Sequence, residues 1–270
     1  MAPDVPRNVQ RAKREPMLKD ARQPEPTDEQ VPADEAVAPA GSLTFAQLLR
    51  PGMNAVRSHW RAFVLIQLFA AALVVGYFTW EPVTRFFGQL SRWREGGGLL
   101  FVSLSSVCAA VILPEIAKAL TQRGEWRLNG AKLRDLGFLI VFFALHGLLV
   151  DSFYRLLAVT IGPGNDVGTV TIKTVIDMLL FGPLIAQPWT ILAFDLRRNS
   201  YRIRPTLAAV SVKWYLHRTM PLQLPAWAFW TPMVVLIYAL PPSLQIVLWT
   251  GAMGAWSLVM VFIGRGEEPD

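Results

Sequence analysis

The sequence predicts an all-α fold, a polytopic transmembrane helical bundle of about four to six spans behind a disordered N-terminal tail. Three observations predict it. Hydrophobic residues make up 53% of the 270 residues and charged residues 17%, whereas a soluble domain carries roughly 25% charged residues. The apolar residues fall in blocks that approach the ~20 helical residues needed to cross a ~30 Å hydrocarbon core. These blocks are too long for β-barrel strands and lack their alternation.

Residues 1–60 form the first predicted region, a polar tail. Residues 1–42 contain eight acidic residues, six basic residues and seven prolines, with no aromatic residue. Such a segment buries too little apolar surface to offset the entropy of ordering, so we expect it to be disordered. No apolar stretch lies near the start of the chain, so we expect no cleavable secretory signal, and the acidic residues are atypical of a transit peptide.

The second predicted region, residues 61–264, is the transmembrane helical domain. Its first span, about Ala62 to Trp80, has no charged residue and closes with aromatic residues that suit a membrane interface. Residues 81–98 begin with Glu-Pro and end with three glycines, which predicts a flexible connection. The second span runs from Leu99 to about Leu120, and we expect Pro114 to kink it or to start a new helical turn.

Five further segments complete the predicted domain. Two are spans interrupted by polar residues, and a third is a basic amphipathic helix at the interface. A proline-rich, aromatic block is expected to be a broken helix, and an uncharged span closes the domain. The segments are, in this order, about Leu136 to Ile161, about Thr171 to Phe194, 206–219, 221–242 and 244–263.

Basic residues gather on one predicted side of the bilayer. They lie in the tail, in residues 121–135, in residues 195–218 and at the end of the chain. The positive-inside rule then places both termini on the cytoplasmic or matrix-like side, which requires an even number of spans. The net charge of +6 therefore describes topology, and without a basic helix or an aromatic-basic platform we expect no nucleic-acid partner. We expect the single cysteine, Cys108, to be a small buried apolar residue.

Ionisable residues inside the spans are the functional candidates, because an unpaired charge at bilayer depth costs several kcal/mol. Three pairs of opposite charge are spaced to share a helix face, and one histidine lies in the third span, where we expect it to bond another helix. Two interpretations remain open: these groups line a pore, or they neutralise each other and fix helix packing. The candidate pore or helix-packing residues are Glu115, Lys118, His146, Asp151, Arg155, Lys173 and Asp177. Asp177, followed by Pro183, is the strongest pore candidate.

Catalytic signatures are missing from the sequence. It has no HExxH, CxxC, Gly-x-Ser-x-Gly, Walker or dinucleotide-binding motif. We therefore predict no catalytic residue, metal or cofactor, and we do not expect an enzyme. The serines at 103, 105 and 106 are expected to let two membrane helices approach closely.

From about Pro114 onward the chain carries three motifs in a distinctive order. Their residues are Gly147, Phe153, Tyr154 and Arg155, then Lys173, Asp177 and Pro183, then Trp230, Pro232, Tyr238, Pro241 and Trp256. This order resembles that of the Mpv17/PMP22 family of integral membrane proteins. The resemblance implies a protein of an organelle membrane, mitochondrial inner or peroxisomal, with weakly selective channel activity.

Together these observations predict a membrane channel or transporter for small solutes or ions. The alternative is a non-transporting scaffold or interaction protein whose intramembrane charge pairs are structural. The expected partners are the lipid bilayer and an unidentified small solute or ion, and a homo-oligomer is left open.

Overall fold

The computed structural model describes residues 45–121 and 127–263, which are mostly helical and contain no strand. This confirms the predicted all-α class; most of the predicted tail lies outside the described residues. Five helical segments are long and apolar enough to cross a membrane: Trp60–Thr79, Glu81–Thr121, Gly130–Thr160, Val167–Arg198 and Met220–Tyr238. The described chain is therefore compatible with an integral membrane protein. The sixth predicted span corresponds to α10 (Pro242–Ile263), which is not among these five.

The first two helices meet at a tight corner. α1 (Phe45–Thr79) begins well before the predicted first span, and α2 (Glu81–Val107) follows after the single extended residue Trp80. The prediction of a flexible connection over residues 81–98 is wrong, because this segment is helical. Pro82 at the first turn starts a helix as readily as it ends one. Phe87 is buried and packs edge-on against Tyr77 of α1, with ring centroids 5.9 Å apart.

Gly98 is the one position where α2 leaves helical geometry, with φ +52° and ψ −132°. Glycine adopts a positive φ without steric cost, so the kink falls in the three-glycine run. Beyond it, the helix continues through the π-helical turn η1 (Cys108–Ile112) into α3 (Leu113–Thr121). The predicted irregularity around Pro114 is therefore a π turn just before the proline.

Cys108, the first residue of η1, is exposed, so the prediction that it is buried is wrong. Cys108 lies within the candidate membrane span Glu81–Thr121. A cysteine side chain is small and largely apolar, so it is stable both in a protein core and on an apolar outer surface. The sequence alone therefore could not show whether Cys108 is buried or exposed.

The next two long segments form a helical hairpin. α4 (Gly130–Thr160) begins at Asn129, whose side chain caps the backbone N–H of Lys132. The second arm consists of α5 (Val167–Ile176), the π helix η2 (Asp177–Ala186) and α6 (Gln187–Arg198). In η2 each backbone N–H bonds the carbonyl five residues earlier. Pro183 has no N–H, so the carbonyl of Met178 lacks its helical donor. Trp227 donates to that oxygen from Nε1 at 2.9 Å.

The predicted amphipathic helix 206–219 is two short helices, so that prediction is wrong. α7 (Ile203–Ala208) and α8 (Val212–Arg218) are separated by Ser211 in an extended conformation. The Ser211 hydroxyl caps the backbone N–H of Trp214 at 3.1 Å, which starts α8 afresh. α8 is held to the end of α6 because Asp195 accepts from the Trp214 indole at 3.0 Å and from Arg218.

The predicted broken helix over residues 221–242 is also wrong, because α9 (Met220–Tyr238) is continuous and long enough to be a candidate span. Its interior prolines, Pro225 and Pro232, leave carbonyls without helical donors, but a continuous helix is tolerated when neighbouring side chains bond them. The core centres on α9 and α10, where Phe229, Met233 and Ile237 are fully buried.

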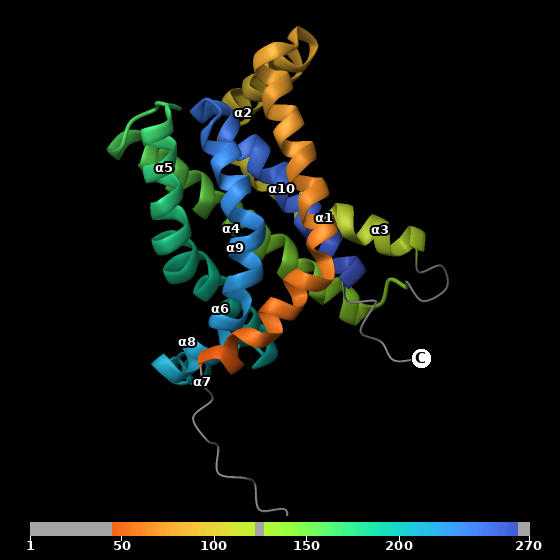
Figure 1. Cartoon of the computed structure of the whole chain (residues 1–270). Helices are drawn as coiled ribbons and strands as arrows, with labels where there is room; N and C mark the ends of the chain where they lie inside the picture. Colours follow the sequence, from red (N-terminus) through yellow and green to blue (C-terminus); the bar gives the residue numbers. More distant parts are fainter. Residues whose placement is uncertain (1–44, 122–126, 264–270) are drawn as a thin grey trace, which may run out of the picture. The chain divides into compact units, whose positions relative to one another are not determined.

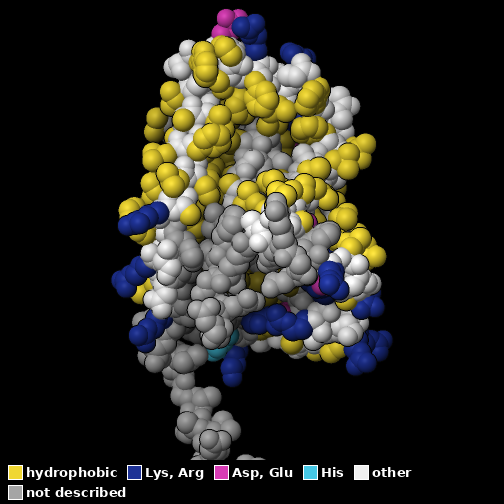
Figure 2. Space-filling model, turned by 90° about the vertical axis from the view of Figure 1, so that its right-hand side faces the viewer, with side chains coloured by type: hydrophobic (Ala, Val, Ile, Leu, Met, Phe, Trp, Pro, Cys, Tyr) yellow, Lys and Arg dark blue, Asp and Glu magenta, His cyan; other side chains and the backbone are white. Residues whose placement is uncertain are grey.

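The other long helices pack around this core. α9 lies beside α1 and α5, and α2 lies beside α4 (Figure 1). α10 contacts α1, α2, α4 and α9, so it is the shared partner of the long helices. On the face shown in Figure 2, hydrophobic side chains form a broad exposed area, and most Lys and Arg side chains gather below it. This separation is typical of a protein whose apolar flank contacts lipid.

Candidate functional site

A group of four buried residues, which we call the Asp177–Tyr238 cluster, brings two ionisable candidates together. Its members are Tyr154 of α4, Lys173 of α5, Asp177 of η2 and Tyr238 of α9. The Tyr238 hydroxyl donates to Asp177 Oδ2 at 2.7 Å, and its ring meets that of Tyr154 edge-on at 5.3 Å. Lys173 Nζ lies 5.9 Å from the centre of the Tyr238 ring.

Lys173 and Asp177 are almost completely buried, at 1% and 4% exposed, yet they do not pair with each other. Lys173 Nζ instead reaches the carbonyl oxygen of Gly164, 3.4 Å away, in the loop before α5. Asp177 points to Tyr238 on the neighbouring helix. Spacing alone predicted a shared helix face, but the side chains of this pair extend to different partners.

The chemistry of this cluster follows from its groups. A carboxylate held by one phenol can exchange a proton or bind a cation, and the nearby ammonium can bind an anion. Asp177 begins η2, and π-helical segments occur frequently at functional sites. The cluster therefore combines two buried ionisable side chains with an irregular stretch of backbone.

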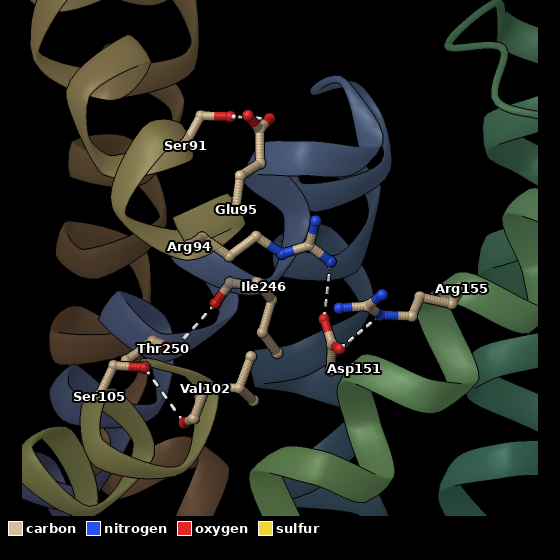
Figure 3. Close-up of polar contacts among 9 residues, drawn as sticks. All are labelled: Ser91, Arg94, Glu95, Val102, Ser105, Asp151, Arg155, Ile246 and Thr250. Carbon is tan, nitrogen blue, oxygen red and sulfur yellow. Dashed lines mark hydrogen bonds and ion pairs between the residues drawn. The ribbon is translucent and has the colours of Figure 1, made fainter. Parts of the chain in front are cut away.

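A second centre surrounds Asp151, which is 1% exposed (Figure 3). Arg94 Nη2 lies 2.9 Å from Asp151 Oδ1, and Arg155 Nε lies 2.6 Å from Oδ2. Arg155 is the predicted neighbour on the same helix, whereas Arg94 comes from the arm of α2 that was expected to be a loop. Asp151 is thus bound by two guanidinium groups from two helices.

A third centre is Glu115, which joins the start of α3 to the start of α4. Its Oε1 lies 2.9 Å from Lys118 Nζ, the predicted partner, and its Oε2 lies 2.7 Å from Lys132 Nζ. Lys132 was not predicted, because it lies in a segment interpreted as a basic loop. These contacts connect the first turn of α3 to the first turn of α4.

His146 is buried within an aromatic group. Its ring stacks on Phe142 at 5.5 Å and contacts Trp249 of α10 at 5.9 Å. No hydrogen bond reaches His146 Nδ1 from any residue that the structure describes. The predicted hydrogen bond to another helix is therefore replaced, at this nitrogen, by ring packing. The described ranges also contain no group of three or more metal-ligating side chains.

Two grooves of about 350 Å³ and 360 Å³ run along the seam between the second arm of the hairpin and α9. Thr174 and Val175 line both grooves, and Met178, Trp227 and Val235 are among their other lining residues. Neither groove is lined by a member of the Asp177–Tyr238 cluster. These grooves are therefore apolar features of the outer helix surface, separate from the buried charges.

Two residues that bond another helix in the structure were not predicted: Arg94 pairs with Asp151, and Gln67 of α1 donates to the carbonyl oxygen of Ala228 in α9. Arg94 belongs to a stretch in which apolar residues recur at helical spacing, a signal that the glycines obscured. Gln67 is the only residue with an amide side chain in the first apolar block, Ala62 to Trp80. An amide side chain within a span predicts a hydrogen bond to another helix.

The Asp177–Tyr238 cluster is built from residues of all three motifs that carry the resemblance described above. Tyr154 belongs to the first motif, Lys173 and Asp177 to the second, and Tyr238 to the third. Comparison with models of known protein families, with characterised proteins and with solved structures finds no match for this chain.

Proposed function

We propose that this chain is a divergent member of the Mpv17/PMP22 family and conducts or transports small solutes or ions, with Asp177 as the charge that the solute meets. One observation carries the proposal: three motifs far apart in sequence contribute side chains to one buried cluster. Tyr238 contacts Asp177, Tyr154 and Lys173. Lys173 and Asp177 are both buried in this cluster without pairing with each other, whereas the charges of a scaffold are expected to neutralise one another.

The contacts around Asp177 suggest how a passage opens. The two grooves beside η2 are not lined by the cluster, so we expect a solute to gain access when η2 and α9 separate. Two hydrogen bonds hold them together, from Tyr238 to Asp177 and from Trp227 to the carbonyl of Met178. Both involve η2, a π-helical segment of the kind that occurs frequently at functional sites, and we expect the passage to open there.

Flux through proteoliposomes tests the proposal. Purified protein is reconstituted, and uptake of small anions, cations and neutral solutes is compared with that of protein-free vesicles. We expect flux above background, and we expect Asp177→Asn to change its rate or charge preference about tenfold, because a charged hydrogen-bonding partner is worth about 1.5–3 kcal/mol. Asp135→Asn is the matched control, since Asp135 is half exposed and pairs with Arg197 outside the cluster.

Flux at background for every solute class would contradict the proposal, provided that the reconstituted protein retains its helical circular dichroism. The same result would favour the scaffold. Asp151 supports that second candidate, because two arginines from two helices bind its carboxylate. The scaffold predicts that Asp177→Asn lowers the unfolding temperature while flux stays at background in both proteins.

We also propose an organelle membrane, mitochondrial inner or peroxisomal, as the location that the family resemblance implies. The test is to express the chain with its amino terminus intact and a tag at the other end. Colocalisation with a marker of either organelle supports this location. A signal confined to the plasma membrane or the endoplasmic reticulum contradicts it.

A further inference from the structure

We propose that Arg94 and Arg155, joined by Asp151, form a binding site for an anionic phosphate or carboxylate group. We call these three residues the Arg94–Arg155 site. It lies between α2 and α4, shares no residue with the Asp177–Tyr238 cluster and does not depend on transport. The proposal rests on the charge balance, the unused donors and the accessibility of this site.

The charges of the site do not balance. Two guanidinium groups contact one carboxylate, which leaves one excess positive charge within the candidate spans. Glu95, the next residue after Arg94, does not compensate, because its carboxylate accepts from Ser91 at 3.2 Å and lies apart from the Arg94 guanidinium (Figure 3). An excess charge within a membrane span is costly, and a bound anion would neutralise it.

The arginines also have donors to spare. A guanidinium carries five N–H groups, and each of these uses one nitrogen on Asp151. Arg94 Nε is buried and has no partner among the described residues. Phosphate and carboxylate oxygens fit the planar fork of arginine in pairs, so an anion of this class can bond the terminal nitrogens of Arg155, whose bond to Asp151 is made through Nε.

The site is both accessible and held in place. The Arg155 side chain is 54% exposed and that of Arg94 is 14% exposed, so a ligand approaches from the Arg155 side. Arg94 is positioned by the helical arm that precedes the kink at Gly98, and Asp151 orients both guanidinium groups (Figure 3). The donors are therefore fixed before a ligand binds, which lowers the entropic cost of binding.

The shared chemistry is an anionic oxygen group, which two sources can supply. A lipid headgroup approaches from the bilayer, and a small soluble anion approaches from water. The test uses the full chain in neutral detergent. The first arm measures retention of phosphatidylglycerol against phosphatidylcholine by native mass spectrometry, and the second measures the shift in unfolding temperature with inorganic phosphate.

We expect wild-type protein to respond to at least one anionic probe, and Arg155→Gln to weaken that response about tenfold, the value of a hydrogen bond to a charged group. Arg155→Lys keeps the charge but loses the fork, so it should restore only part of the response. Arg92→Gln is the matched control, because Arg92 lies on the same arm, is exposed and bonds Gln89. Retention of phosphatidylglycerol alone identifies a lipid site, and a phosphate response identifies a soluble anion.

Two results would overturn the proposal. One is a wild-type protein that responds to neither anionic probe. The other is an equal loss in Arg155→Gln and Arg92→Gln, which would show attraction by net charge instead of a built site. Because Arg155 is half exposed, its substitution is compatible with folding, and circular dichroism checks this. These readouts are independent of solute flux, so the site and the proposed transport can fail separately.

Discussion

Gln67 of α1 donates from Nε2 to the carbonyl oxygen of Ala228 in α9, 3.1 Å away. Ala228 is four residues before Pro232, whose ring nitrogen cannot donate to it. The amide of one helix therefore replaces the donor that the proline of another helix removes. The same nitrogen lies 3.3 Å from the carbonyl of Phe229, so Gln67 bonds the backbone at the point where α9 would otherwise weaken.

Replacing Gln67 should destabilise the packing of α1 on α9. We expect Gln67→Leu to lower the free energy of unfolding by about 1 kcal/mol, because interhelical hydrogen bonds in membranes are worth roughly 0.6–2 kcal/mol. Unfolding in mixed detergent micelles, followed by circular dichroism, measures this loss.

A double-mutant cycle with Pro232→Ala supplies the control. Alanine restores an N–H that can donate to Ala228, so Gln67→Leu should cost less in the Pro232→Ala protein than in wild type. Equal costs in the two backgrounds would mean that Gln67 acts through packing alone, and the explanation by proline would then be wrong.

The crossing of α2 and α4 depends on Gly147. A Cβ atom at this position would lie 2.0 Å from the Ser106 hydroxyl oxygen and 2.7 Å from its Cβ. We therefore expect Gly147→Ala to destabilise the protein by about 1–3 kcal/mol, the usual cost of overpacking. Gly137→Ala is the matched control, because Gly137 lies on the same helix with no neighbour within 4 Å of such a Cβ.

Rescue sharpens the Gly147 prediction. Ser106→Gly removes both clashing atoms, so Gly147→Ala combined with Ser106→Gly should be more stable than Gly147→Ala alone. If Gly147→Ala and Gly137→Ala unfold at the same temperature, the close approach of the two helices is not a determinant of stability.

Much of the fold could be predicted from sequence, because long uncharged blocks have few alternatives to spanning helices. The failures occurred at prolines and glycines. Pro232 was expected to break α9, but its effect depends on Gln67, a residue more than 160 positions away. The three glycines before Leu99 were expected to loosen a whole segment, whereas only Gly98 leaves helical geometry. Local signals do not reveal which neighbour will bond a freed carbonyl.

The candidate site was predictable only in part. Intramembrane charge identified Asp151, Lys173 and Asp177 as buried groups, and all three are buried. Their partners were not predictable from i,i+4 spacing, since Arg94 reaches Asp151 from another helix and Tyr238 reaches Asp177 from a third. Spacing along one helix describes a single face and gives no information about the helix packed against it.

Asp166 should make stability depend on pH. The Thr169 hydroxyl donates to its carboxylate at 2.6 Å and the Thr169 backbone N–H at 3.1 Å, and these bonds lower the pKa of Asp166 below its usual 3.8. A lowered pKa in the folded state contributes stability above the unfolded-state pKa, and this contribution is lost as the pH falls through the folded-state pKa. Wild type should therefore unfold at a higher temperature than Asp166→Asn near neutral pH, with the difference shrinking in acid.

The comparison of these two proteins cancels the titration of the other carboxylates. Unfolding temperature is measured for both across the acidic range, in the same neutral detergent. A difference that stays constant into acid would show that the charge of Asp166 does not stabilise the start of α5. The Asn side chain can still cap the helix, so the variant tests the charge and keeps the cap.

Cys108 offers a test of which surface faces lipid. It is the only cysteine in the chain, it is exposed, and it lies within the candidate span Glu81–Thr121. If that surface contacts hydrocarbon, a water-soluble, membrane-impermeant maleimide cannot reach the thiol in intact or permeabilised vesicles, and labelling should occur only after solubilisation in a denaturing detergent. Arg204→Cys in a Cys108→Ala background is the control, since Arg204 is exposed on α7 and should label in vesicles in which its side of the membrane is accessible. Labelling of Cys108 as fast as that control would mean that water reaches η1, and this side of the second span would then line an aqueous path instead of facing lipid.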